Sequence, residues 1–173
     1  MSALLQEQTK ISAKTASSDA LSEATNVNAA NLQPRRGKAA VQHAAKLARD
    51  AEQKACERQH AKGKSTARER LDLLFDTGSF VEIGRFNGGD INNDVAGCAV
   101  ITGFGEVYGR KVAVYAQDFS VRGGTLGKAE GEKICHLLDM ALQLRVPVVA
   151  VIDSGGARIQ EGVNALMQYG RIF

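Results

Sequence analysis

Cysteine is scarce in this sequence. The three cysteines, Cys56, Cys98 and Cys135, lie far apart, and no two of them form a Cys-x-x-Cys pair. A structural zinc ribbon needs closely paired ligands, so that class of site is not expected. An odd, scattered set of thiols is typical of reduced cysteines in a cytoplasm-like compartment. We therefore expect a cytoplasmic protein with no metal ion, in which Cys98 and Cys135 are small core side chains.

Long apolar runs are also missing. No stretch approaches the roughly 18 residues that span a bilayer, and no signal-peptide core is visible. The net charge of +3 is too small to indicate nucleic-acid binding. With 44% hydrophobic and 24% charged residues, the composition is that of a globular protein that needs neither membrane nor nucleic acid.

Aromatic residues are absent from residues 1–32, which are rich in Ser, Ala, Thr, Asn and Gln. Such a segment buries too little apolar surface to offset the entropy of ordering it. We therefore expect a disordered tail over residues 1–33. A transit peptide is the alternative, but the acidic residues Glu7, Asp19 and Glu23 argue against it.

A helical segment is predicted over residues 34–77. Small and apolar residues recur at spacings of three and four through residues 34–60, which indicates one helix packed on a neighbour or a solvated helix. Thr66 and Glu69 have the spacing of a capping box, which predicts a second, short helix through Leu74.

An α/β pattern follows over residues 78–173. A strand is expected at 80–83, a polar surface loop at 85–94, and a β-hairpin from 99–107 and 111–116. A helix should begin near Gly123 and Gly124 and run to about Arg145, with one apolar stripe. The stripe contains Ile134, Leu137, Leu138, Ala141 and Leu142. The branched run at 148–152 reads as a fully buried strand, followed by a glycine turn at 153–157 and a further helix.

Two glycine pairs stand at strand-to-helix junctions, Gly123-Gly124 and Gly155-Gly156. Backbone N–H groups at such turns can hold an anion, and glycine lets a ligand approach them. Neither G-x-x-x-x-G-K-S/T nor G-x-G-x-x-G is present, so a nucleotide-phosphate cradle is not indicated. Either pair alone could simply permit a tight turn. Both together favour an oxyanion site with one donor from each turn.

Four segments carry a specific resemblance: residues 62–72, 78–82, 117–127 and 153–162. The last reads Asp-Ser-Gly-Gly-Ala-Arg-Ile-Gln-Glu-Gly, far more specific than a lone glycine pair. From about residue 59 to 173 the sequence resembles the carboxyltransferase β subunits of biotin-dependent acyl-CoA carboxylases, of the propionyl-CoA carboxylase type. The resemblance implies the amino-terminal part of a crotonase-like (ββα repeat) α/β domain. We expect this domain to be incomplete at residue 173.

The resemblance also implies an activity. Enzymes of this family move a carboxyl group from carboxybiotin to the α-carbon of an acyl-CoA, here propionyl-CoA or acetyl-CoA. Backbone N–H groups hold the enolate oxygen, and no protein side chain need act as the base. By matching position, Gly155 and Gly156 are the expected donors, with Gly123 and Gly124 contributing from the other turn.

Contacts with the CoA ester are expected from residues in or near the same motifs. They are Lys62, Lys64, Arg68, Arg122, Ala157 and Arg158. Two simpler readings stay open: Arg68 or Arg70 could pair with Asp72 or Glu69, and Arg158 could pair with Glu161. Arg122 stands where the family usually has an aromatic residue, and the 85–94 loop is shorter than in propionyl-type relatives. Both departures leave the acyl chain open.

The implied partners follow from the family. Carboxybiotin would arrive on a biotinylated α subunit, whose biotin carboxylase alone uses ATP and bicarbonate. The chain itself would form a homo-oligomer, a hexamer by resemblance. Two alternatives remain: a biotin-dependent acyl-CoA decarboxylase subunit, or a truncated, non-catalytic CoA-binding or assembly module. Because the biotin site needs a second domain, we expect the isolated 173 residues to be inactive.

Overall fold

The computed structural model describes residues 37–89 and 97–173. The expected tail at 1–33, the first residues of the expected helix at 34–60 and residues 90–94 of the expected loop at 85–94 lie outside the described residues. Residues 85–88 form a turn, as the polar composition predicted.

A four-stranded sheet with the order β1-β2-β3-β4 forms the centre of the fold. Its strands are β1 (Val81–Ile83), β2 (Val100–Val107), β3 (Arg110–Gln117) and β4 (Val148–Val151). The pairs β1–β2 and β2–β3 are antiparallel, whereas β3 and β4 are parallel. The predicted hairpin is β2–β3: Tyr108 and Gly109 both have positive φ, 51° and 71°, as a two-residue type I′ turn requires.

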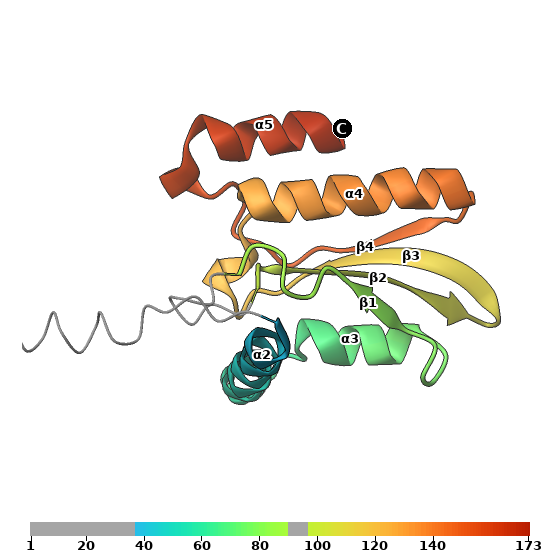
Figure 1. Cartoon of the computed structure of the whole chain (residues 1–173), viewed down its shortest axis with the longest axis horizontal. Coiled ribbons are helices and arrows are strands. Elements are labelled where there is room, and N and C mark those ends of the chain that lie inside the picture. The colour runs from blue at the N-terminus through green and yellow to red at the C-terminus, as the bar shows by residue number, and fades with distance from the viewer. Residues whose placement is uncertain (1–36, 90–96) are drawn as a thin grey trace, which may run out of the picture.

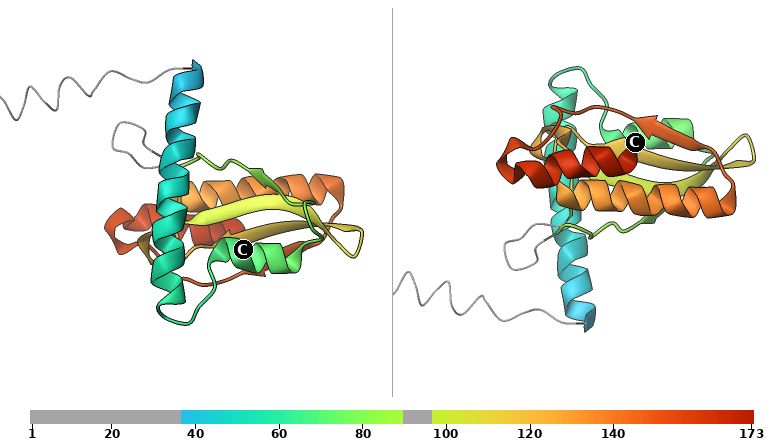
Figure 2. Two further views of the ribbon diagram at one scale, coloured as in Figure 1. Left: turned by 90° about the horizontal axis from the view of Figure 1, so that it is seen from below. Right: turned by 90° about the horizontal axis from the view of Figure 1, so that it is seen from above.

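Helices cover both faces of the sheet (Figure 1). On one face lie α4 (Lys128–Leu144) and, outside it, α5 (Val163–Ile172); on the other lie α2 (Gly37–His60) and α3 (Ala67–Leu74). Figure 2 shows α2 crossing the direction of the strands and of α4. Among these described helices, none is both long and apolar enough to cross a bilayer.

The core has one part on each side of the sheet. On the α3 side, Leu71 and Phe75 pack against Val112 and Val114. On the α4 side, the predicted stripe supplies Ile134, Leu137 and Ala141, all buried. Leu142 was expected in this stripe, but its side chain is 78% exposed because it lies on the outer side of α4.

Strand β4 corrects the expectation of a fully buried strand at 148–152. Within the described residues β4 pairs only with β3, and its residues are half-buried or exposed, with Val148 at 38% exposure. Ile152, the residue after the strand, is 63% exposed. A branched apolar run has the same composition in a central strand and in an edge strand. The position in the sheet therefore could not be read from the run itself.

Helix α4 begins four residues later than predicted. Residues Arg122–Gly124 form a 3-10 turn (η2), and Leu126 then makes a parallel β-bridge to Ala157 before the helix starts at Lys128. The short bridge uses the backbone that a helix would otherwise need. The capping box of α3 is confirmed: Glu69 N donates to Thr66 Oγ1 at 3.2 Å, and Thr66 N donates to Glu69 Oε2 at 2.7 Å.

Candidate active site

The two glycine turns meet at the carboxyl ends of β3 and β4. These strands are parallel neighbours, so the segments that follow them leave the same edge of the sheet. Gly155 N donates to Gly123 O at 2.9 Å, which joins the first turn to the second. The bridge continues the junction: Leu126 N donates to Gly156 O at 2.9 Å, and Arg158 N donates to Leu126 O at 2.8 Å.

Glycine is needed for different structural reasons at Gly124 and at Gly156. Gly124 has a φ of 63°, and a Cβ there would lie against the carbonyl oxygen of Asp153, so this position needs glycine for close packing. Gly156 has a φ of 98°, and a Cβ there would meet nothing within 4 Å. Space beside Gly156 is therefore open to a ligand, whereas the space beside Gly124 is filled by the second turn.

The backbone N–H groups decide which donors remain for a ligand. Gly124 N donates to Val121 O, and Gly155 N donates to Gly123 O, both at 2.9 Å. Gly156 N donates to Ser154 Oγ at 3.0 Å. Within residues 37–89 and 97–173, no acceptor faces the N–H of Gly123 or of Ala157. One available donor thus comes from each turn, and neither is on Gly155.

A buried ion pair holds the two turns to the start of α4. Arg158 Nη2 lies 2.6 Å from Glu130 Oε1, and the side chains of Arg158 and Glu130 are 8% and 0% exposed. Arg158 Nη1 bonds Glu161 Oε1 at 2.7 Å, and its other donors reach the hydroxyl and carbonyl of Thr125. Burial alone would raise the pKa of Glu130, but hydrogen bonds from Arg158 and from Ala99 N–H hold that pKa below its usual range.

These contacts give Arg158 a structural role, and the expected contact with the CoA ester stays a prediction. Its guanidinium is bound by groups of the protein itself. The pairing of Arg158 with Glu161, which the sequence left open as an alternative, is present. Arg158 belongs to the turn before η3 (Ile159–Glu161) and positions Ala157 through the backbone. Glu130 was missed in the sequence because its partner lies 28 positions away, although its place in the first turn of α4 is typical of a capping residue.

The basic segment divides into paired and unpaired cations. Arg68 pairs with Glu52 at 2.6 Å and Glu82 at 2.9 Å, so it is held between α2 and β1. Arg70 pairs with Asp153 at 3.0 Å. Both arginines are thus paired, but with partners other than Asp72 and Glu69. The Arg70 contact places α3 beside the second glycine turn.

Lys62 and Lys64 are the exposed cations of this segment. Lys64 Nζ lies 5.7 Å from the ring centre of Phe119, in the loop that leads to the first glycine turn. Within the described parts of the chain, no carboxylate pairs with either lysine. They are therefore the members of the segment that remain available to a phosphate.

Arg122 also faces the region between α2 and the sheet. Its backbone is left-handed, with a φ of 50°, and its carbonyl accepts a hydrogen bond from Thr125 Oγ1 at 2.8 Å. Arg122 lines a hollow of about 280 Å³ together with Asp118 and Lys133. Lys133 Nζ donates to Val100 O at 2.6 Å, and burial lowers the pKa of this lysine.

Comparison with known proteins shows the family to which the chain belongs. Residues 58–173 match the family model described as the carboxyl transferase domain. The chain belongs to this family. It is 50% identical over 127 residues to the propionyl-CoA carboxylase beta chain of Saccharopolyspora erythraea, an alignment that covers 70% of this chain and 23% of that one. The methylmalonyl-CoA decarboxylase subunit alpha of Propionigenium modestum is 52% identical over 126 residues, 69% of this chain and 24% of the other.

A solved carboxyltransferase has the same fold. The structure of transcarboxylase 12S, with methylmalonyl-coenzyme A and methylmalonic acid bound, superposes with a TM-score of 0.69 at 35% identity and covers 81% of this chain and 29% of the other. The crotonase-like α/β fold and the family resemblance are thereby confirmed. The chain spans about a quarter of the length of the curated relatives it matches.

Proposed function

We propose that this chain supplies the acyl-CoA side of a carboxyltransferase site, in which a carboxyl group passes from carboxybiotin to the α-carbon of an acyl-CoA. The observation that carries the proposal is the pair of available N–H groups, Gly123 and Ala157, where the two glycine turns meet. Two backbone donors aimed at one thioester oxygen stabilise the negative charge of the enolate. Propionyl-CoA or acetyl-CoA is the proposed substrate.

The residues of the chain would act by holding and positioning. Gly123 and Ala157 hold the thioester oxygen, in place of the expected donation by Gly155 and Gly124.

Gly156 leaves room beside these two donors. Its own N–H is bound to the Ser154 hydroxyl and could exchange that partner for the ligand. Carboxybiotin, when bound, would supply the carboxyl group and, after losing it, the base for the α-proton. The ion pair of Arg158 and Glu130 would fix the position of the two turns relative to the start of α4.

The wider assembly follows the same proposal. Carboxybiotin would be carried by a biotinylated partner, which would use ATP and bicarbonate, and the chain would assemble with copies of itself, as a hexamer, in the cytoplasm. Transcarboxylase 12S, whose fold this chain shares, assembles as a hexamer. Residues 1–33, 34–77 and 78–173 would be a tail, a helical segment and the first part of the carboxyltransferase domain.

Decarboxylation is the second candidate. The decarboxylase subunit of Propionigenium modestum is as similar to this chain as the carboxylase subunit of Saccharopolyspora erythraea. The same enolate site serves either direction, since the two reactions share that intermediate. Dependence of product formation on ATP and bicarbonate would separate the candidates, because only the carboxylase consumes them.

Titration calorimetry with propionyl-CoA tests the binding half of the proposal. We expect saturable binding, weakened about tenfold when Lys62→Gln and Lys64→Gln are combined, because each lysine would lose a charged contact with a CoA phosphate. Lys46→Gln, an exposed lysine of α2, should leave the affinity unchanged. Binding that is absent, or equally weakened by Lys46→Gln, would contradict the assignment of these lysines.

A further inference from the structure

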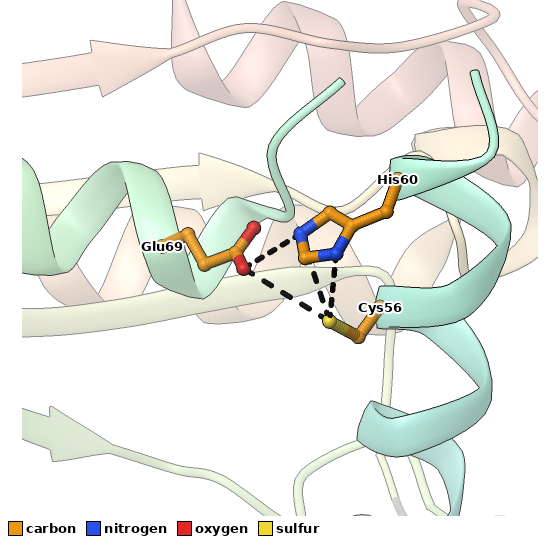
Figure 3. Close-up of side chains that lie close together, drawn as sticks. All are labelled: Cys56, His60 and Glu69. Atoms are coloured by element: carbon orange, nitrogen blue, oxygen red, sulfur yellow. Dashed lines mark hydrogen bonds and ion pairs between the residues drawn. The ribbon is translucent and has the colours of Figure 1, made fainter. Parts of the chain in front are cut away.

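Three side chains able to bind a metal meet where α2 ends and α3 begins (Figure 3). Cys56 and His60 are one helical turn apart on α2, and Glu69 lies in the first turn of α3. His60 Nε2 is 2.8 Å from Glu69 Oε1 and 3.7 Å from Cys56 Sγ, and Cys56 Sγ is 3.9 Å from Glu69 Oε1. None of these residues contacts the glycine turns.

We propose that Cys56, His60 and Glu69 form a binding site for one Zn²⁺ ion. Thiolate, imidazole and carboxylate are the ligands that zinc takes in proteins. At the usual zinc bond lengths, tetrahedral geometry sets the ligand atoms about 3.3 to 3.6 Å apart. The separations of 3.7 and 3.9 Å to the sulfur are close to that spacing. Only the 2.8 Å contact between His60 and Glu69 must open slightly.

The ligands are already oriented by the local structure. One oxygen of Glu69 accepts Thr66 N–H at 2.7 Å in the capping box, which leaves the other oxygen turned toward His60 and Cys56. The link between the helices is short and folded: Gly63 N donates to His60 O at 2.9 Å, and Lys64 N donates to Gln59 O at 3.0 Å. Orientation of a ligating carboxylate by a second hydrogen bond is a common feature of metal sites.

A simple ion pair between His60 and Glu69 is the competing account of this cluster. That pair explains the 2.8 Å contact, but it gives no reason for a thiol within hydrogen-bonding reach of both partners. The scarcity of cysteine argued against a zinc ribbon, and this site differs because it draws on one cysteine from a helix and on two other residue types. Bound zinc would fasten α2 to α3, the helix whose Arg70 contacts Asp153.

Metal binding by the purified chain tests the proposal. After dialysis against Zn²⁺ we expect one equivalent retained per chain, and Co²⁺ in its place should give a thiolate-to-metal absorption band in the near ultraviolet. Cys56→Ser should abolish the band, and Cys56→Ser or Glu69→Gln should each weaken Zn²⁺ binding by at least about tenfold. Glu69→Gln keeps an acceptor for Thr66 N–H, so α3 should stay capped.

The controls are Cys98→Ala and Glu57→Gln. Cys98 is a thiol outside the cluster, and Glu57 is an exposed carboxylate on the same helix, so both variants should bind Zn²⁺ like the parent chain. Zn²⁺ should also slow alkylation of Cys56 by iodoacetamide and leave Cys98 unaffected. Undiminished Zn²⁺ binding in the Cys56→Ser variant, or no stoichiometric binding in the parent chain, would overturn the site. Neither result would bear on acyl-CoA binding.

Discussion

Glu130→Gln is expected to lower the free energy of unfolding by about 3 kcal/mol, because it removes the fully buried one of the two carboxylates that pair with Arg158 and leaves only the more exposed Glu161. Glu130 has no exposed surface, and one of its oxygens accepts from both Arg158 and Ala99 N–H. Urea denaturation followed by circular dichroism measures the change. The matched control is Glu132→Gln, two residues along α4, where the exposed pair with Lys128 spans 3.9 Å and should be worth less than about 1 kcal/mol.

The same carboxylate predicts a pH dependence of stability. The pKa of Glu130 is lower in the folded chain than in the unfolded chain, so its stabilising effect is complete above the unfolded value, about 4.3. That effect is lost as pH falls through the folded value. The parent chain should therefore lose its advantage over Glu130→Gln below about pH 4. Parallel stability curves for the two proteins down to that range would contradict the role given to Glu130.

Ala157→Pro is expected to lower the rate of carboxyl transfer about 10²- to 10³-fold, the usual cost of losing one oxyanion donor. Proline removes the N–H of Ala157, which no described residue accepts. The β-bridge uses Gly156 O and Arg158 N, so it loses no hydrogen bond of its own. The measurement is carboxyl transfer by the proposed complete carboxyltransferase carrying this change, with the proposed biotinylated partner and saturating acyl-CoA.

Ala157→Gly is the matched control for this prediction, because it keeps the N–H and removes only the methyl group. It should retain most of the activity. Where proline disturbs the fold, an ester bond in place of the amide at position 157 removes the same N–H without fixing φ. Full activity of a folded chain that lacks this N–H would contradict the assigned donor.

Much of the fold could be predicted because its signals are local. The type I′ hairpin at Tyr108 and Gly109 and the capping box of α3 each depend on residues within a few positions of one another. The two glycine pairs could likewise be placed at neighbouring turns. In contrast, the sequence could not predict which N–H groups are available to a ligand. The N–H of Gly155, for example, already donates to Gly123 O in the other turn.

Ion-pair partners were the least predictable part of the site. Arg70 pairs with Asp153, 83 positions away, although Asp72 and Glu69 are near in sequence. Several carboxylates compete for each arginine, and only the packing of α3 beside the sheet selects one. The same holds for Cys56 and Glu69, which come together because a short turn brings α3 back against the end of α2.

The infrared spectrum of bound propionyl-CoA, labelled with ¹³C at the thioester carbonyl, tests the central claim most directly. The proposed hydrogen bonds from Gly123 and Ala157 would polarise that carbonyl, so its stretching frequency should fall when the ligand binds to the parent chain. The shift should be reduced in Ala157→Pro and retained in Ala157→Gly. Saturable binding with an unshifted carbonyl band, or an equal shift in Ala157→Pro, would show that the two glycine turns do not form the oxyanion site.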